Sequence, residues 1–152
     1  MKLASLWVLS FALAACAADS SPGDGAVASA PEGRWKLEDA RDADGGRIEA
    51  LFPQGMATRT LELEADTLLA RGGCNSISGY HRIDAQGRLV IARLTWTLVS
   101  CSDELERADQ AFRGLLEGTA EWTIEESYPE RLRMQYTDGH SSVWTADVAP
   151  PP

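Results

Sequence analysis

The stretch of sequence that decides the fold is RLRMQYTDGHSSVWTA, residues 131–146. Arg131–Tyr136 and Ser142–Ala146 alternate between polar and apolar side chains, which is the period of a half-buried β-strand. Between them lies Asp138-Gly139, a pair that tight hairpin turns favour because both residues tolerate left-handed backbone. The segment therefore predicts an antiparallel β-hairpin.

The same alternation predicts further strands upstream. In Thr60–Ala65, two leucines occupy one face of the strand and two glutamates, Glu62 and Glu64, occupy the other. The remaining predicted strands are Arg34–Glu38, Ile77–Ile83, Arg88–Ile91 and Glu121–Glu125. Turn-forming Asp, Gly and Gln residues separate them, which favours an antiparallel sheet.

One segment has the period of a helix instead. Its apolar stripe consists of Leu105, Ala108, Phe112, Leu115 and Leu116, and its polar face of Glu104, Glu106, Arg107, Asp109 and Arg113. Asp103 and Glu106 have the spacing of a capping box, and Gly118 is a natural helix stop. The predicted fold class is α+β: an antiparallel, curled β-sheet that resembles an open barrel, with one inserted α-helix.

Composition and net charge limit the fold and the class of partner. The chain has 152 residues, of which 44% are hydrophobic, and this suits one globular domain. Its formal net charge of −9 argues against nucleic acid as a partner, because phosphate contacts need clustered Lys and Arg.

The N-terminus has the pattern of an export signal. Lys2 precedes the apolar run Leu3–Ala15, which is shorter than the about 20 residues of a membrane-spanning helix. The run ends in Leu13-Ala14-Ala15-Cys16, which resembles the lipobox of bacterial lipoproteins. That resemblance implies removal of residues 1–15 and acylation of Cys16, with attachment to a membrane through lipid. Ala17 stands where such proteins carry an inner-membrane retention Asp, so we expect the outer membrane, on its periplasmic face.

Four parts of the chain follow from these patterns. Residues 1–15 are the predicted signal peptide, and residues 16–32 are a flexible tether rich in Ala, Ser, Gly and Pro. Residues 33–147 form the folded domain, and residues 148–152 are a disordered tail. Within the domain, Cys74 and Cys101 are the two cysteines, and export to an oxidising compartment predicts that they form a disulfide.

Three segments of the domain resemble the META domain family. They are Gly33–Leu37, Gly73–Tyr80 with its Gly-Cys-Asn motif, and Leu94–Cys101 with its Leu-x-x-Thr-x-x-x-Cys pattern. Phe112 and Leu116 stand where the family's helix supplies core residues. The resemblance, which extends to the HslJ-like heat-shock lipoproteins, implies a non-catalytic envelope protein that acts through protein contacts in envelope or stress tolerance. In this chain, Trp96, Leu98, Val99 and Ser100 replace residues that are commoner in the family.

The motif residues have structural interpretations. Gly73, with Gly72, permits a tight bend and close backbone approach, and Asn75 tolerates left-handed geometry and bonds its own loop. Gly79 inside a strand predicts a bulge or close packing against a neighbour. Thr97 belongs to the third motif.

The chemical alternatives have weaker patterns. Cys74 and His81 would make a thiol nucleophile and its base, and Cys74, His81 and Cys101 a zinc site, but close ligand pairs are missing. Ser78, His81 and Asp84 lack a nucleophile-elbow sequence. The carboxylate pairs Glu62/Glu64 and Glu125/Glu126 are best interpreted as solvated charge. We therefore expect no enzyme activity, no metal and no cofactor.

Four tryptophans leave the function open. Trp35, Trp96, Trp122 and Trp144 lie in or beside predicted strands, so core packing is the first interpretation. The alternative is a stacking face for a glycan or an apolar cleft within the sheet. The candidate functions are thus an envelope protein that binds another protein, a carrier or pilot-like module for a lipid or partner helix, and a hydrolase.

Overall fold

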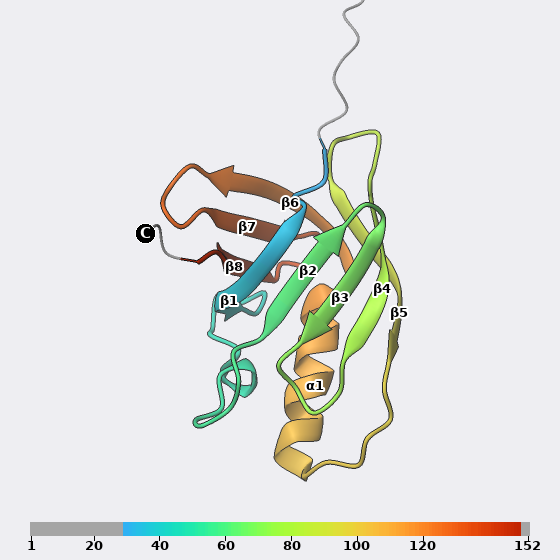
Figure 1. Ribbon diagram of the computed structural model, residues 1–152, viewed down its shortest axis with the longest axis vertical. Coiled ribbons are helices and arrows are strands. Elements are labelled where there is room, and N and C mark those ends of the chain that lie inside the picture. The colour runs from blue at the N-terminus through green and yellow to red at the C-terminus, as the bar shows by residue number, and fades with distance from the viewer. Residues whose placement is uncertain (1–28, 150–152) are drawn as a thin grey trace, which may run out of the picture.

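Eight antiparallel strands form a closed barrel in the computed structural model, which describes residues 29–149 (Figure 1). The strands are β1 (Gly33–Arg41), β2 (Thr60–Glu64), β3 (Thr67–Arg71), β4 (Ile77–Ile83), β5 (Leu89–Trp96), β6 (Gly118–Glu125), β7 (Arg131–Tyr136) and β8 (Ser141–Ala146). A short 3-10 helix, η1 (Glu49–Leu51), follows β1, and the α-helix α1 (Asp103–Leu116) lies between β5 and β6. Each strand pairs with the next along the chain, and β1 pairs with β8.

Closure of the sheet differs from the open barrel expected from sequence. The β1–β8 pairing runs from Trp35 to Arg41 on β1 and seals one seam along most of its length. The β5–β6 seam is much shorter, because only Leu89–Ile91 pair with Gly118–Ala120. Closing the sheet removes most of its unpaired edge, which open sheets must protect in other ways. The barrel is therefore closed, and its shortest seam is the one between β5 and β6, where α1 is inserted.

Most predicted strands are confirmed, and β3 is the one that sequence reasoning missed. The strands at Ile77–Ile83 and Arg131–Tyr136 have the predicted bounds, and Gly139 has the positive φ of 96° that the predicted hairpin turn needs. In β3, Leu68 and Ala70 are buried while Leu69 between them is half-buried, so the apolar residues are consecutive and do not alternate. A short strand of that kind gives no period-2 signal.

Helix α1 packs its apolar face into the barrel, as its stripe predicts. Phe112, Leu115 and Leu116 are buried, and the Phe112 ring lies 6.3 Å from that of Trp144. The predicted capping box at Asp103 is wrong by one residue: the N-cap is Ser102, whose hydroxyl accepts the Leu105 N–H at 3.5 Å. Serine is a preferred N-cap, and Asp103 then lies in the first turn, where the helix dipole favours a carboxylate.

Apolar side chains fill the interior of the barrel. They include Trp35, Leu37, Leu61, Leu63, Leu68, Ile91, Phe112, Leu132, Met134 and Trp144. Trp35 also donates its indole N–H to the carbonyl of Pro31 at 3.0 Å, and Pro31 is fully buried. The packed unit therefore begins inside the segment that the sequence assigns to the tether. Within residues 29–149, no helix has the length and apolar character required to cross a membrane.

Candidate functional site

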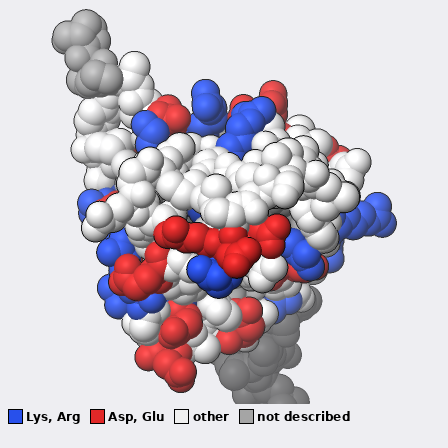
Figure 2. Space-filling model, turned by 90° about the horizontal axis from the view of Figure 1, so that it is seen from below, with Lys and Arg blue, Asp and Glu red and all other residues white. Residues whose placement is uncertain are grey.

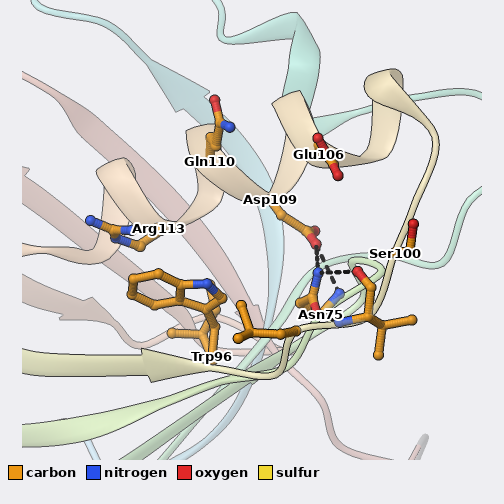
Figure 3. Close-up of a pocket in the computed structure, with 10 residues that line it drawn as sticks. Asn75, Trp96, Ser100, Glu106, Asp109, Gln110 and Arg113 are labelled. Carbon is orange, nitrogen blue, oxygen red and sulfur yellow. Dashed lines mark hydrogen bonds between the residues drawn. The ribbon is translucent and has the colours of Figure 1, made fainter.

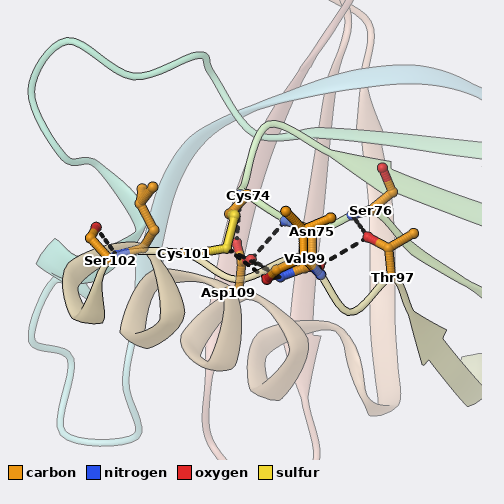
Figure 4. Close-up of a disulfide and its surroundings, with 9 residues drawn as sticks. Cys74, Asn75, Ser76, Thr97, Val99, Cys101, Ser102 and Asp109 are labelled. Atoms are coloured by element: carbon orange, nitrogen blue, oxygen red, sulfur yellow. Dashed lines mark hydrogen bonds between the residues drawn. A yellow bond between two sulfur atoms is a disulfide. The ribbon is translucent and has the colours of Figure 1, made fainter.

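A disulfide joins the β3–β4 turn to the segment that leads into α1. It links Cys74 to Cys101, as the sequence predicts, with Cα atoms 6.4 Å apart (Figure 4). This separation lies within the about 4.4–6.8 Å range that disulfides span. The bond holds the start of α1 against the end of the barrel.

The Asp109 carboxylate binds the same turn from the helix side. It accepts hydrogen bonds from the backbone N–H groups of Cys74 at 3.2 Å and Asn75 at 2.8 Å, and from the Asn75 side-chain amide at 3.1 Å. The prediction that Asp109 lies on the solvent face of the helix is wrong. Asp109 lies four residues after Leu105 and three before Phe112, so it borders the apolar stripe, and that position was the available signal.

Asn75 connects this turn to the segment after β5. Its side-chain oxygen accepts the Val99 N–H at 2.8 Å and the Thr97 hydroxyl at 3.0 Å. The Thr97 hydroxyl in turn accepts the Ser76 N–H at 3.1 Å. Two of the motif residues, Asn75 and Thr97, are thus in direct contact, and together with Asp109 they tie three segments into one network.

Neighbouring atoms lie so close to the motif glycines that a side chain would not fit there. Gly72 has a φ of +100°, and a Cβ there would overlap the Thr58 carbonyl, while a Cβ on Gly73 would overlap the Asp109 carboxylate. Gly79 faces a register shift in the β4–β5 pairing, and a Cβ on it would lie 2.6 Å from the Leu94 side chain. The predicted tight bend is confirmed. For Gly79, close packing against a neighbour is confirmed, and the extra residue of the bulge lies opposite it on β5.

A groove of about 500 Å³ lies between α1 and the segment that follows β5 (Figure 3). Its lining residues are Asn75, Ile77, Trp96, Leu98, Val99, Ser100, Glu106, Asp109, Gln110 and Arg113. The Arg113 guanidinium lies 4.1 Å from the centre of the Trp96 ring, a cation–π contact that joins the two walls.

Three apolar side chains beside this groove are exposed to solvent. Leu98 is 89% exposed, Val99 56% and Trp96 43%. We name Trp96, Leu98 and Val99 the apolar tip. Large apolar side chains that stay exposed next to one another indicate an interaction surface more often than isolated ones do.

The tryptophans divide into two groups. Trp35 and Trp144 are buried, which confirms core packing, and half-buried Trp122 packs on the core while donating its indole N–H to the Gly87 carbonyl at 3.1 Å. Core packing is wrong for Trp96, because that residue lies where β5 leaves the barrel and faces the groove.

The charge around the apolar tip is mainly negative. Asp103, Glu104 and Glu106 all lie in the first turn of α1. Figure 2 views the molecule from this end, where acidic side chains form a band beside a broad uncharged area. A cationic group would therefore be favoured here.

A buried arginine supports the network from inside. Arg59 is 1% exposed, donates from Nη1 to the Gly72 carbonyl, and lies 5.7 Å from the centre of the Phe112 ring. Burial lowers the pKa of Arg59, and the negative charge of Asp109 partly opposes this shift. Sequence reasoning missed Arg59 because no pattern distinguishes it from the exposed arginines.

The candidate catalytic groups are not brought together. His81 is 3% exposed and points into the barrel, whereas Ser78 is exposed and shares a hydrogen bond with the Thr95 hydroxyl. Burial lowers the pKa of His81, and nearby Asp66 and Glu32 oppose the shift. Asp84 is engaged by Arg88 at 2.8 Å, so these three residues do not form a triad.

The carboxylate pairs also have ordinary surroundings. Glu62 lies 3.6 Å from Arg71, and Glu125 forms an ion pair with Arg133. Glu62 and Glu64 lie on β2, Glu125 ends β6 and Glu126 follows it, and none of the four is buried, which fits solvated charge.

Within residues 29–149, one group of side chains has metal-ligand proximity, namely Cys74, Cys101 and Asp109. The two sulfurs are bonded to each other and the carboxylate already accepts three hydrogen bonds, so this set suits a structural link. His81 is not part of it, and the zinc set considered from the sequence is therefore not assembled.

Comparisons with known proteins agree with this architecture. The profile of the META domain family matches residues 28–148, and the chain belongs to that family. A comparison with curated protein sequences finds no match.

Two solved structures are similar to this chain. One is the NMR structure of a protein from Burkholderia xenovorans, which has 20% sequence identity and a TM-score of 0.64, with 78% of this chain and 83% of that chain covered. The other is a DUF4847 family protein from Bacteroides vulgatus, with 14% identity and a TM-score of 0.48, covering 79% and 95% respectively. The first shares the fold.

Proposed function

We propose that this member of the META domain family is an envelope lipoprotein whose domain is not an enzyme and acts by binding another protein, in envelope or stress tolerance. One observation carries the proposal: the apolar tip is exposed, yet the backbone beneath it is fixed. The Val99 N–H is bonded to Asn75, and the tip extends from the last residue of β5 toward the Cys74–Cys101 disulfide. A rigid apolar surface loses little conformational entropy on binding, which favours a protein contact.

The proposed anchor is a lipid on Cys16. Its support is the Leu13–Cys16 sequence, which resembles a lipobox, and these residues lie outside the part of the chain that the structure describes. Cys16→Ser should release the protein from the outer-membrane fraction. Mass spectrometry of the wild-type protein should find an acylated N-terminal cysteine. An unacylated product that retains Met1 would contradict this part of the proposal.

The proposed contact is tested by photo-crosslinking in intact envelopes. A benzoylphenylalanine at position 98 should form a protein adduct, because Leu98 is 89% exposed at the tip. The matched control is the same group at position 128, since Tyr128 is 67% exposed and does not line the groove. Equal adducts at both positions, or none at position 98, would overturn the binding role. Ester, peptide or glycan hydrolysis that is lost in His81→Ala would overturn the non-catalytic role.

The carrier function, with a lipid or partner helix held inside the sheet, has less support. Trp144, Phe112 and Leu132 occupy the interior of the barrel, and the groove of about 500 Å³ lies outside it against α1. A lipid or helix held inside the barrel would therefore have to displace packed core side chains.

A further inference from the structure

The two halves of β5 differ in how they are paired. Leu89–Ile91 pair with β4 on one side and with β6 on the other. Between Ala92 and Trp96, β5 pairs with β4 alone, within the residues that the structure describes. A register shift opposite Gly79, with Arg93 at a φ of +56°, begins after Ala92, one residue past the last pairing with β6. The second half therefore has a free edge, and bulges commonly terminate pairing in this way.

The hydrogen bonds of neighbouring residues show which backbone groups lie on this edge. The Thr97 N–H donates to the Ser76 carbonyl, and the Val99 N–H donates to the Asn75 side chain. Both donors therefore point toward the β4 side. In extended chain, successive backbone groups point to opposite sides, so those of Trp96 and Leu98 point away from β4. These are the groups with which an added strand would pair.

The groove provides side-chain contacts directly beside that edge. Trp96 and Leu98 line it, and Figure 3 shows Trp96 facing α1, with Gln110 and Arg113 on the opposite wall. Every second side chain of an added strand would face one side. Apolar side chains at those positions would therefore meet Trp96 and Leu98, and Val99 lines the groove beside them.

The charged residues around the groove determine which polar side chains a bound segment should carry. Glu106 lines the groove, and Asp103 and Glu104 flank it in the same helical turn. Arg113 is stacked on Trp96 and lies 3.9 Å from Glu117. Among the residues that line the groove, the charge left unpaired is thus that of Glu106, and a basic segment complements it.

We propose that this site binds an extended segment of a partner protein with alternating apolar and basic residues, which adds as a strand to the free edge of β5. The proposal rests on the proposed protein-binding function and specifies the class of partner. Strand addition of this kind combines backbone hydrogen bonds for affinity with side-chain pockets for specificity.

The probe is the labelled peptide acetyl-Lys-Val-Lys-Leu-Lys-Val-Lys-amide. Its binding is measured by fluorescence anisotropy with the full chain in phosphatidylcholine nanodiscs, and empty nanodiscs serve as the blank. Binding should weaken with salt, and a peptide with Glu in place of every Lys should not bind. A version methylated at alternate backbone nitrogens should bind about tenfold more weakly or worse, because it lacks the donors for β5. Hydrogen exchange at Trp96 and Leu98 should slow when the unmethylated peptide is bound.

Two matched pairs of variants locate the site. Val99→Ser should weaken binding about five- to tenfold, whereas Val148→Ser should not, although the two valines are 56% and 54% exposed. Glu106→Gln should weaken binding about two- to fivefold, and Glu126→Gln, outside the groove, should not.

Absence of binding, equal binding of the methylated peptide, or equal effects within either pair would overturn the proposal. If the peptide fails to bind while position 98 still forms an adduct in envelopes, strand addition is wrong and the protein-binding function stands. If both experiments fail, both proposals fall.

Discussion

The two ends of the barrel are held together in different ways. At the end where α1 begins, a disulfide and the Asn75–Asp109 network tie turn, loop and helix together. At the opposite end, the β2–β3 turn and the entering chain cover His81, whose backbone N–H bonds the Asp66 carbonyl. Figure 1 shows this turn and α1 at opposite ends of the molecule. The first end thus relies on a disulfide and a side-chain hydrogen-bond network, and the second on burial and backbone hydrogen bonds.

The difference has consequences for stability and for function. Asn75 and Asp109 are fully engaged, so the loop that carries the apolar tip has a fixed position. Both ring nitrogens of His81 are buried, and neither has a hydrogen-bond partner within residues 29–149. A buried imidazole of this kind is tolerated only while it is neutral. We therefore propose the first end for binding, and we expect the second to make the stability of the barrel depend on pH.

Removing the disulfide is the strongest way to weaken the linked end. The pair Cys74→Ser/Cys101→Ser should lower the free energy of unfolding by about 2–5 kcal/mol, because the bond restrains the unfolded chain. Urea unfolding of the full chain measures the change, and wild type in reductant is the control. A loss below about 1 kcal/mol would mean that the hydrogen-bond network alone fixes this end.

Removing the Asp109 carboxylate tests that network. Asp109→Ala leaves two backbone N–H groups and the Asn75 amide without their acceptor, so it should cost about 2–4 kcal/mol. Asp103→Ala, an exposed carboxylate on the same helix, should cost less than about 1 kcal/mol. Equal losses would show that the contribution comes from the helix dipole and not from the β3–β4 turn.

The sequence predicts some of this molecule well for clear physical reasons. Period-2 and period-3.6 patterns report burial directly, so the hairpin at Asp138-Gly139 and the Phe112–Leu116 face of α1 were predictable. The pairing of Cys74 with Cys101 followed from there being two cysteines in the domain.

Other features depend on tertiary contacts that no local pattern records. Closure of the sheet requires β1 to meet β8, which lie at opposite ends of the domain sequence. The role of Asp109 requires the β3–β4 turn to reach the helix. Trp96 is exposed because β5 continues past the last residue that pairs with β6. The candidate site was therefore predicted through its motif residues Gly73, Asn75 and Thr97, but not through the groove beside them.

Because of His81, the end of the barrel at the β2–β3 turn should make the free energy of unfolding depend on pH. Burial lowers its pKa below the ordinary value, so in the unfolded state it binds a proton at a higher pH than in the folded state. Stability should thus fall as pH drops below about 6.5, by at most about 1.4 kcal/mol per pH unit, until the folded-state pKa is reached. Urea unfolding between pH 5 and 8 measures the slope.

Substitution assigns this slope to the residue. His81→Leu should remove it, whereas His140→Gln should retain it. Two paired carboxylates respond in a different range: a backbone hydrogen bond from Arg88 holds the pKa of Asp84 below its usual range, and the Lys36 side chain does so for Asp147. Their contributions to stability are lost only at lower pH. A slope that persists in His81→Leu would contradict the assignment.

The smallest effect is expected at the apolar tip itself. Leu98 is 89% exposed, so Leu98→Ser should change the free energy of unfolding by less than about 0.5 kcal/mol. Leu115→Ala on the buried face of the neighbouring helix should cost about 2–5 kcal/mol in the same urea experiment. A Leu98→Ser chain that loses several kcal/mol would mean that Leu98 packs against the domain in solution, and the tip would then be structural. A chain of unchanged stability that no longer binds the Lys-Val-Lys-Leu-Lys-Val-Lys peptide would separate binding from folding, since the side chain removed contributes to the partner contact alone.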